Sequence, residues 1–245
     1  FGTHALTSNT TGQRNTAVGR VALENNSTGD DNTAVGKDAL EGNTTGAYNT
    51  AVGSLALTAN TTASNNTALG YQALYTNTTG TENAAGGGYA LASNTTGNYN
   101  TAFGYASLST ITTASNSSAF GYRALGANTS GGNNHAFGYN ALRLNTTGSY
   151  NSAFGDSALY SNTTANKSTA VGYYALVSAT TGGNNTAVGY RALDTCTDGH
   201  DNAAVGRDAL ADVSTGEKNT AVSTAGQNIT TGQNNLCLGY NAGSS

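Results

Sequence analysis

The sequence predicts an all-β fold, a parallel β-solenoid built from short coils stacked along one axis. Three observations lead to this prediction. The glycine of an N-T-A-V-G motif recurs every 17 residues, without an insertion, through twelve units. Two columns hold one residue type in all twelve units, Ala at position 3 and Leu at position 9. The chain contains no Pro, and a ladder between coils needs every backbone N–H.

The repeats define a single array over residues 1–245, a β-solenoid in which each unit is one coil. A partial unit occupies 1–14, the twelve full units 15–218, an irregular unit of 16 residues 219–234, and a partial unit 235–245. Seventeen residues are too few for a helical-hairpin repeat of about 33 or a leucine-rich repeat of about 20. Because both ends fall inside a unit, we expect the chain to be a segment of a longer fibre.

Each coil is expected to contain a strand around positions 3 and 4. Position 3 is always Ala, whereas position 4 is Val, Leu or Phe, with one exception at Gly86. Adjacent strand residues point to opposite faces, so both faces of this strand are apolar and only one of them looks into the coil. The outer face therefore needs a cover, which is most simply a sister chain.

Glycines at positions 5 and 15 are expected to form corners with positive φ or tight turning. Asn at position 12 is replaced by Ile111, Ala179, Cys196 and Val213 in four units, so we expect a half-buried column whose Asn side chains bond to their copies in neighbouring coils. Cys196 and Cys237 are 41 residues apart, more than two coils, so we expect both to be buried free thiols.

Composition disfavours several functions. Only 9% of the residues are charged and the net charge is −4, which gives no basic surface for nucleic acid. No run approaches the roughly 18 apolar residues of a membrane span, so we expect no membrane insertion. His4, His135 and His200 occupy different positions of the unit, and the acidic turns at 29–31 and 197–201 are not repeated. We therefore expect no catalytic site, no metal and no cofactor, and hence no enzyme.

Aromatic side chains at position 6 are the candidate ligand-binding residues. Such rings suit the flat C–H faces of sugars, although we favour the alternative that they cover a seam between chains. The six tyrosines are Tyr71, Tyr105, Tyr122, Tyr139, Tyr173 and Tyr190.

The repeated N-T-T motif is also an acceptor sequence for N-glycosylation in a eukaryotic secretory route. Because the same Asn residues form the expected ladder column, we favour the structural role. The candidates are Asn9, Asn43, Asn60, Asn77, Asn94, Asn145 and Asn162.

The segments "NTAVG" and "SSAFGYRAL" resemble the head repeats of trimeric autotransporter adhesins of the YadA type. The N-T-A-x-G-x-x-A-L-x-x-N-T-T-G pattern is closer still to repeat arrays of bacterial, phage and large-virus tail fibres. The resemblance implies a left-handed parallel β-roll and a homotrimer on a cell or virion surface. It therefore places the segment outside the cell, as part of an extracellular fibre. Host-surface glycans are the candidate partner that the aromatic residues suggest, and we expect a structural and adhesive segment without catalysis. The added N-T-T-G segment makes this unit longer than that of the adhesin heads.

An ice-binding, Thr-rich β-solenoid is the alternative function. Such proteins order water on a flat face that carries regularly spaced threonines. Here the paired threonines at positions 13 and 14 are adjacent, so their side chains are expected to point to opposite faces. This argument favours the fibre.

Overall fold

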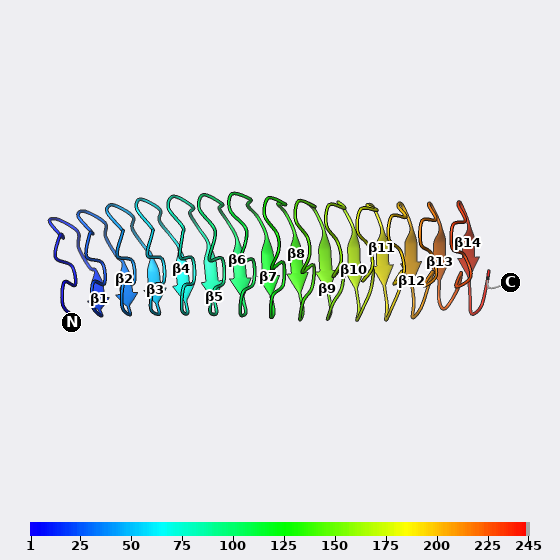
Figure 1. Ribbon diagram of the computed structural model, residues 1–245, viewed down its shortest axis with the longest axis horizontal. Coiled ribbons are helices and arrows are strands. Elements are labelled where there is room, and N and C mark those ends of the chain that lie inside the picture. The colour runs from blue at the N-terminus through cyan, green and yellow to red at the C-terminus, as the bar shows by residue number, and fades with distance from the viewer. Residues whose placement is uncertain (244–245) are drawn as a thin grey trace. The chain divides into compact units, whose positions relative to one another are not determined.

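The computed structural model describes residues 1–243, and its contacts divide the chain into two compact units, Phe1–Ala119 and Phe120–Ser245. Every 17-residue repeat contributes one strand of three residues, and each connection between strands is a series of turns (Figure 1). The strands are β1 (Thr16–Val18), β2 (Thr33–Val35), β3 (Thr50–Val52), β4 (Thr67–Leu69), β5 (Ala84–Gly86), β6 (Thr101–Phe103), β7 (Ser118–Phe120), β8 (His135–Phe137), β9 (Ser152–Phe154), β10 (Thr169–Val171), β11 (Thr186–Val188), β12 (Ala203–Val205), β13 (Thr220–Val222) and β14 (Leu236–Leu238).

Neighbouring strands pair in parallel and in strict register. In the first unit β1 to β6 pair in sequence order, and in the second unit β8 to β14 do the same. Ala34, for example, lies opposite Ala51, and both are fully buried. The prediction of an all-β parallel solenoid with 17-residue coils is therefore confirmed.

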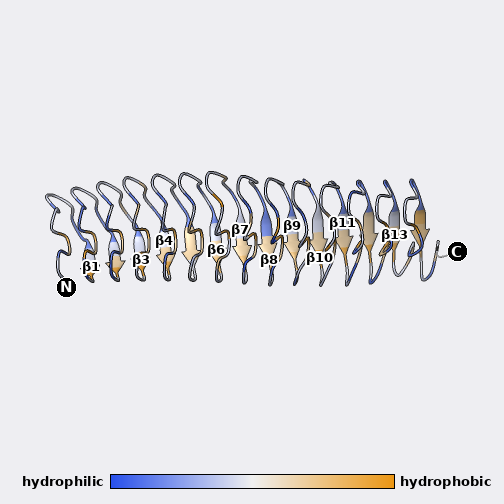
Figure 2. Ribbon diagram, in the orientation of Figure 1, coloured by the Kyte–Doolittle hydropathy of each residue, from blue (hydrophilic) through white to orange (hydrophobic). Residues whose placement is uncertain are grey.

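The core of each coil is a narrow aliphatic column. The Ala at position 3, the Ala at position 8 and the Leu at position 9 are buried, as Ala51, Ala56 and Leu57 illustrate. Full burial of a Leu side chain contributes roughly 1.5–3 kcal/mol. Figure 2 shows apolar colour in most strands, whereas the connections between strands mix polar and apolar residues.

Left-handed backbone at bulky residues makes the coil compact, and the sequence did not indicate it. Positions 7, 9 and 17 all have positive φ; Leu57 has a φ of 52° and Leu142 a φ of 51°. This conformation is uncommon for a bulky residue. It directs the Leu57 N–H to the Ala73 carbonyl of the next coil, 3.0 Å away, while the side chain enters the core. The turns thus carry hydrogen bonds between coils, and one short strand per coil suffices.

Glycine recurs at positions 5 and 15 for two different structural reasons. At position 5 the φ is strongly positive, 139° at Gly53, as expected. The glycines at position 15 show no positive φ, which leaves tight turning as the expectation there. A Cβ on Gly46 would collide with the Ala63 carbonyl of the next coil, yet Ala occupies this position in three units. Position 15 therefore requires a small residue rather than a left-handed one.

The irregular unit loses one residue without losing register. Its strand β13 remains in parallel register with β12 and β14. The Leu210 N–H reaches the Ala225 carbonyl at 2.9 Å, so Ala225 takes position 8 and Gly226, with a φ of 68°, takes position 9. A Cβ on Gly226 would lie 2.6 Å from the Leu210 side chain and 3.4 Å from that of Ile229. The apolar side chain has thus moved from position 9 to Ile229 at position 12.

Candidate functional site

The outer face of the strands carries an exposed apolar stripe formed by position 4. Val52 is 39% exposed and Phe154 is 42% exposed, whereas the Ala before each of them is fully buried. In the second unit Phe137 stacks on Phe120 and on Phe154, with ring centroids 4.8 Å apart in both pairs. The expected apolar outer face is therefore present. We call these residues the strand-face stripe; its exposed members are Val18, Val52, Leu69 and Phe103 in the first unit and Phe120, Phe154, Val171, Val188, Val205, Val222 and Leu238 in the second.

Gly86, the one glycine in the stripe, lies under an aromatic ring. A Cβ added at Gly86 would collide with the Phe103 ring of the next coil. The ring therefore covers the place that a side chain at position 86 would fill.

All six candidate tyrosines are exposed, and several are brought together. Tyr122 stacks on Tyr139 with centroids 5.2 Å apart, and Tyr173 stacks on Tyr190 at 5.6 Å. These rings form a row beside the strand-face stripe, on the other side of the glycine corner at position 5.

In the first unit, Tyr89 joins the exposed tyrosines Tyr71 and Tyr105, and the sequence reasoning missed it. Its ring meets Tyr71 edge-on at 5.3 Å and Tyr105 at 5.7 Å. It stands at position 7, after Gly88 at position 6, so the aromatic side chain is shifted by one residue. The signal was the "GGGY" segment, in which a Tyr directly follows an unusual glycine in the Tyr column.

The Asn column at position 12 forms a hydrogen-bonded ladder, as expected, but it is fully buried rather than half-buried. Asn60 donates from Nδ2 to Asn43 Oδ1 at 2.8 Å and to the Ala63 carbonyl at 3.0 Å. Asn77 donates to Asn60 Oδ1 at 3.2 Å in turn. Each amide thus links its neighbouring coils and closes its own turn.

A second Asn ladder, at position 1, was not predicted. Asn49 accepts at Oδ1 from the Asn66 backbone N–H at 3.0 Å, and its Nδ2 donates to the Ala63 carbonyl at 2.8 Å. The position-15 carbonyl therefore receives donors from both ladders, here from Asn49 and Asn60. Asn, with one donor group and one acceptor, suits both columns.

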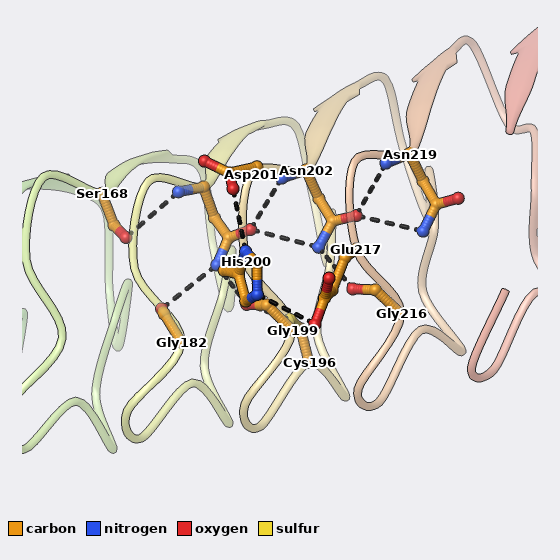
Figure 3. Close-up of polar contacts among 11 residues, drawn as sticks. Ser168, Gly182, Cys196, Gly199, His200, Asp201, Asn202, Gly216, Glu217 and Asn219 are labelled. Carbon is orange, nitrogen blue, oxygen red and sulfur yellow. Dashed lines mark hydrogen bonds and ion pairs between the residues drawn. The ribbon is translucent and has the colours of Figure 1, made fainter. Parts of the chain in front are cut away.

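One carbonyl left open by a break in both ladders gains a donor from the next coil. In the unit with Ser168 at position 1 and Ala179 at position 12, neither side chain has an amide for the Gly182 carbonyl. Asn185 of the next coil donates to that carbonyl at 3.1 Å and also to Gly199 at 2.7 Å (Figure 3).

The ladder ends explain two buried oxygens without a partner. Asn94 Oδ1 and Asn162 Oδ1 have none, because the next coils carry Ile111 and Ala179 where an amide would donate. The cost of one such group is about 1–3 kcal/mol.

The burial of position 12 bears on the glycosylation candidates. Asn9 is partly exposed, and the other six are fully buried. Their Nδ2 atoms, which a glycan would modify, are hydrogen-bond donors within the ladder. A glycan on any of these six nitrogens is incompatible with this fold.

His200 lies between two carboxylates. Its Nδ1 is 2.8 Å from Asp201 Oδ2, and its Nε2 is 2.9 Å from Glu217 Oε1 (Figure 3). The hydrogen bond to Asp201, together with the charge of Glu217, raises the pKa of His200 above its usual value of 6.5. His4 and His135 are exposed, as expected for surface polar residues.

The His200 cluster predicts a small pH dependence of stability. A raised folded-state pKa means that the stabilisation is fully present below the unfolded pKa and is lost as the pH rises through the folded pKa. Between about pH 6 and about pH 8 we expect the unfolding temperature to fall by at most about 2 °C, because the groups are partly exposed. Thermal unfolding of wild type and His200→Gln at both pH values checks this. An equal decline in the variant would assign the effect to other groups.

Both cysteines are buried free thiols, as expected. Cys196 takes position 12, where its Sγ donates to the Gly199 carbonyl at 3.5 Å (Figure 3). Burial raises the pKa of this thiol to about 11, which makes it a poor nucleophile near neutral pH.

Two features are absent from residues 1–243: a metal-ligating cluster and a helix able to cross a membrane. No group of three or more His, Cys, Asp or Glu side chains is placed to hold a metal ion. Within the same described range, no helix has the length and apolar character to cross a membrane.

Comparison with known proteins adds no relative. No protein-family model, curated protein or solved structure matches the chain.

Proposed function

We propose that the chain is a non-catalytic segment of an extracellular surface fibre, in which three copies pack through the strand-face stripe. This makes it a structural and adhesive part of a tail fibre or adhesin, carried by a cell or a virion. The observation that carries the proposal is the stripe itself, since it places an apolar side chain on the outside of nearly every coil. Contiguous exposed apolar surface of this kind is typical of an interface between proteins.

Two further features support copies of the same chain as the partner. The stripe repeats once per coil, and the centroids of its stacked Phe rings are 4.8 Å apart. An identical chain therefore presents a row of side chains with the same spacing. The columns that stay nearly constant from unit to unit form the core and the ladders. The variable columns therefore remain for contact with other molecules. The handedness and the number of copies come from the resemblance to adhesin and tail-fibre repeats.

The geometry of the threonines supports the ice-binding alternative less well than the fibre proposal. The hydroxyl at position 13 donates to the carbonyl of the next coil, as Thr44 does to Thr61 at 3.0 Å. Position 14, represented by Thr45, is the exposed member of the pair. A flat face with paired free hydroxyls is therefore not formed by these columns.

Lysines placed in the stripe test the proposed assembly. We expect the double variant Val52→Lys/Leu69→Lys to dissociate into monomers, because two charges per chain would be buried at the interface without partners. The control Thr45→Lys/Thr62→Lys adds the same charge at exposed position 14, and we expect it to keep the oligomeric state of the wild type. Light scattering coupled to size exclusion measures both. If the stripe variant kept the oligomeric mass of the wild type, the interface would lie elsewhere.

A further inference from the structure

The second unit carries two adjoining pockets on the face formed by positions 6, 7 and 10. The first is about 450 Å³ in volume and is bordered by Tyr139, Asn140, Asp156 and Tyr174. The second is about 460 Å³ and is bordered by Tyr173, Tyr190 and Arg191. Tyr174 and Val177 border both pockets, so the two hollows are adjacent. Both volumes lie in the range of small-molecule sites.

These columns differ widely from unit to unit. The core and ladder columns repeat with few changes, whereas position 6 alone contains Arg, Lys, Ser, Tyr, Gly and Asp. A unique arrangement of side chains can therefore arise on this face, unlike in the core and ladder columns. The face is also separated from the strand-face stripe by the glycine corner, so the proposed assembly leaves it accessible.

The first pocket combines aromatic rings with hydrogen-bonding groups. Tyr139 is 53% exposed and Tyr174 is 37% exposed, so each offers ring surface to a ligand. Asp156 is exposed and accepts a hydrogen bond from the Ser157 hydroxyl at 2.7 Å, which orients the carboxylate. Beside them Arg143 donates to the Tyr160 hydroxyl at 3.0 Å and holds that ring in place.

Asn140 adds an unsatisfied acceptor at the border of the pocket. It is 8% exposed, and its Oδ1 has no hydrogen-bond partner. The other two unpaired amide oxygens of the described residues end a ladder, but Asn140 stands at position 7 and belongs to neither ladder. A hydroxyl donor that arrives through the pocket would satisfy this oxygen once the amide turns toward the opening.

We propose that the two pockets bind consecutive residues of a neutral oligosaccharide, one sugar on each side of the stacked pair Tyr173 and Tyr174, whose ring centroids lie 4.3 Å apart. Rings that face C–H surfaces, with a carboxylate and an amide that accept from hydroxyls, match the chemistry of a pyranose. The lining of the first pocket has one carboxylate and no cation, which disfavours an acidic sugar. In the second pocket Arg191 is paired with Asp194, so its charge is neutralised. This inference deepens the adhesive role proposed above, by naming a ligand class for it, and rests on that role.

Binding of a defined sugar panel tests the inference. Lactose, N-acetyllactosamine, maltotetraose, cellotetraose and 3′-sialyllactose are titrated into the full chain and followed by saturation-transfer NMR. We expect at least one neutral sugar to bind, and sialyllactose to bind no more tightly than lactose. Tyr174→Asn should lower the affinity at least tenfold while tolerating the positive φ of 57°. Asp156→Asn, at an exposed carboxylate, should weaken binding without affecting the fold.

Tyr48→Asn is the matched control, because Tyr48 is also an exposed Tyr with a φ of 58° but lies in the first unit. Its affinity should equal that of the wild type. The inference is overturned if no neutral sugar binds at millimolar concentration, or if Tyr174→Asn binds as the wild type does. If the chain were a trimer that binds no sugar, the sugar-binding inference would be overturned and the proposed fibre assembly would stand. If the chain were a monomer that binds sugar, the proposed trimeric assembly would be overturned and sugar binding would stand.

Discussion

Replacing Gly87 with alanine is expected to destabilise the first unit by several kcal/mol, while alanine at the adjacent Gly88 is expected to change its stability little. Gly87 has a φ of 127°, and a Cβ there would lie 2.7 Å from the Gly104 carbonyl of the next coil. The strained backbone alone costs on the order of 1–3 kcal/mol, and the contact forces the two coils apart. At Gly88 the nearest atom to a Cβ is in the Tyr105 ring at 3.7 Å, an ordinary contact.

Urea unfolding followed by circular dichroism measures both glycine variants against the wild type. The two substitutions add the same methyl group at neighbouring positions, so composition and helix or strand propensity are matched. Equal losses of stability in the two variants would mean that the corner at position 5 does not govern the stacking of coils.

Aspartate in place of Asn60 is expected to cost at least about 3 kcal/mol at neutral pH. The Nδ2 of Asn60 donates to Asn43 Oδ1 and to the Ala63 carbonyl, so an aspartate would present a buried negative oxygen to two acceptors. Burial raises the pKa of such a carboxyl, and the penalty therefore grows as the pH rises above the unfolded value of about 3.9.

Asn65→Asp is the matched control for the ladder variant. Asn65 lies in the same coil, is exposed, and has a φ of 61°, which aspartate also tolerates. It adds the same charge outside the ladder, and we expect it to change stability by less than about 0.5 kcal/mol. Chemical denaturation at about pH 4 and about pH 7 separates the two. A similar, pH-independent effect in both variants would contradict the buried ladder.

The sequence predicts the columns of this fold well because each coil faces a copy of itself. A residue that fits between two identical neighbours must have the same size in every unit, so invariant Ala and Leu report the core directly. The ladder at position 12 was visible because its substitutes, such as Ile111 and Val213, are apolar. At position 1 the substitutes are Ser117 and Ser168, which look like surface residues, and that ladder was missed.

Other features depend on backbone geometry that no residue type announces. The left-handed conformation at Leu57 contradicts the preference of leucine, and contacts with the next coil impose it. The pockets arise from residues such as Tyr139 and Tyr174, two coils apart, and their depth depends on how the intervening Asp156 and Ser157 are arranged. The Tyr column predicted an aromatic face, but it could not predict which members form a hollow.

Sedimentation equilibrium of the wild-type chain, over a dilution series down to nanomolar concentration, tests most directly whether copies of the chain cover the strand-face stripe. We expect a species of three times 24.5 kDa that persists through the series. A stable monomer at every concentration would show that the apolar outer face needs no partner chain, and would contradict the proposed fibre.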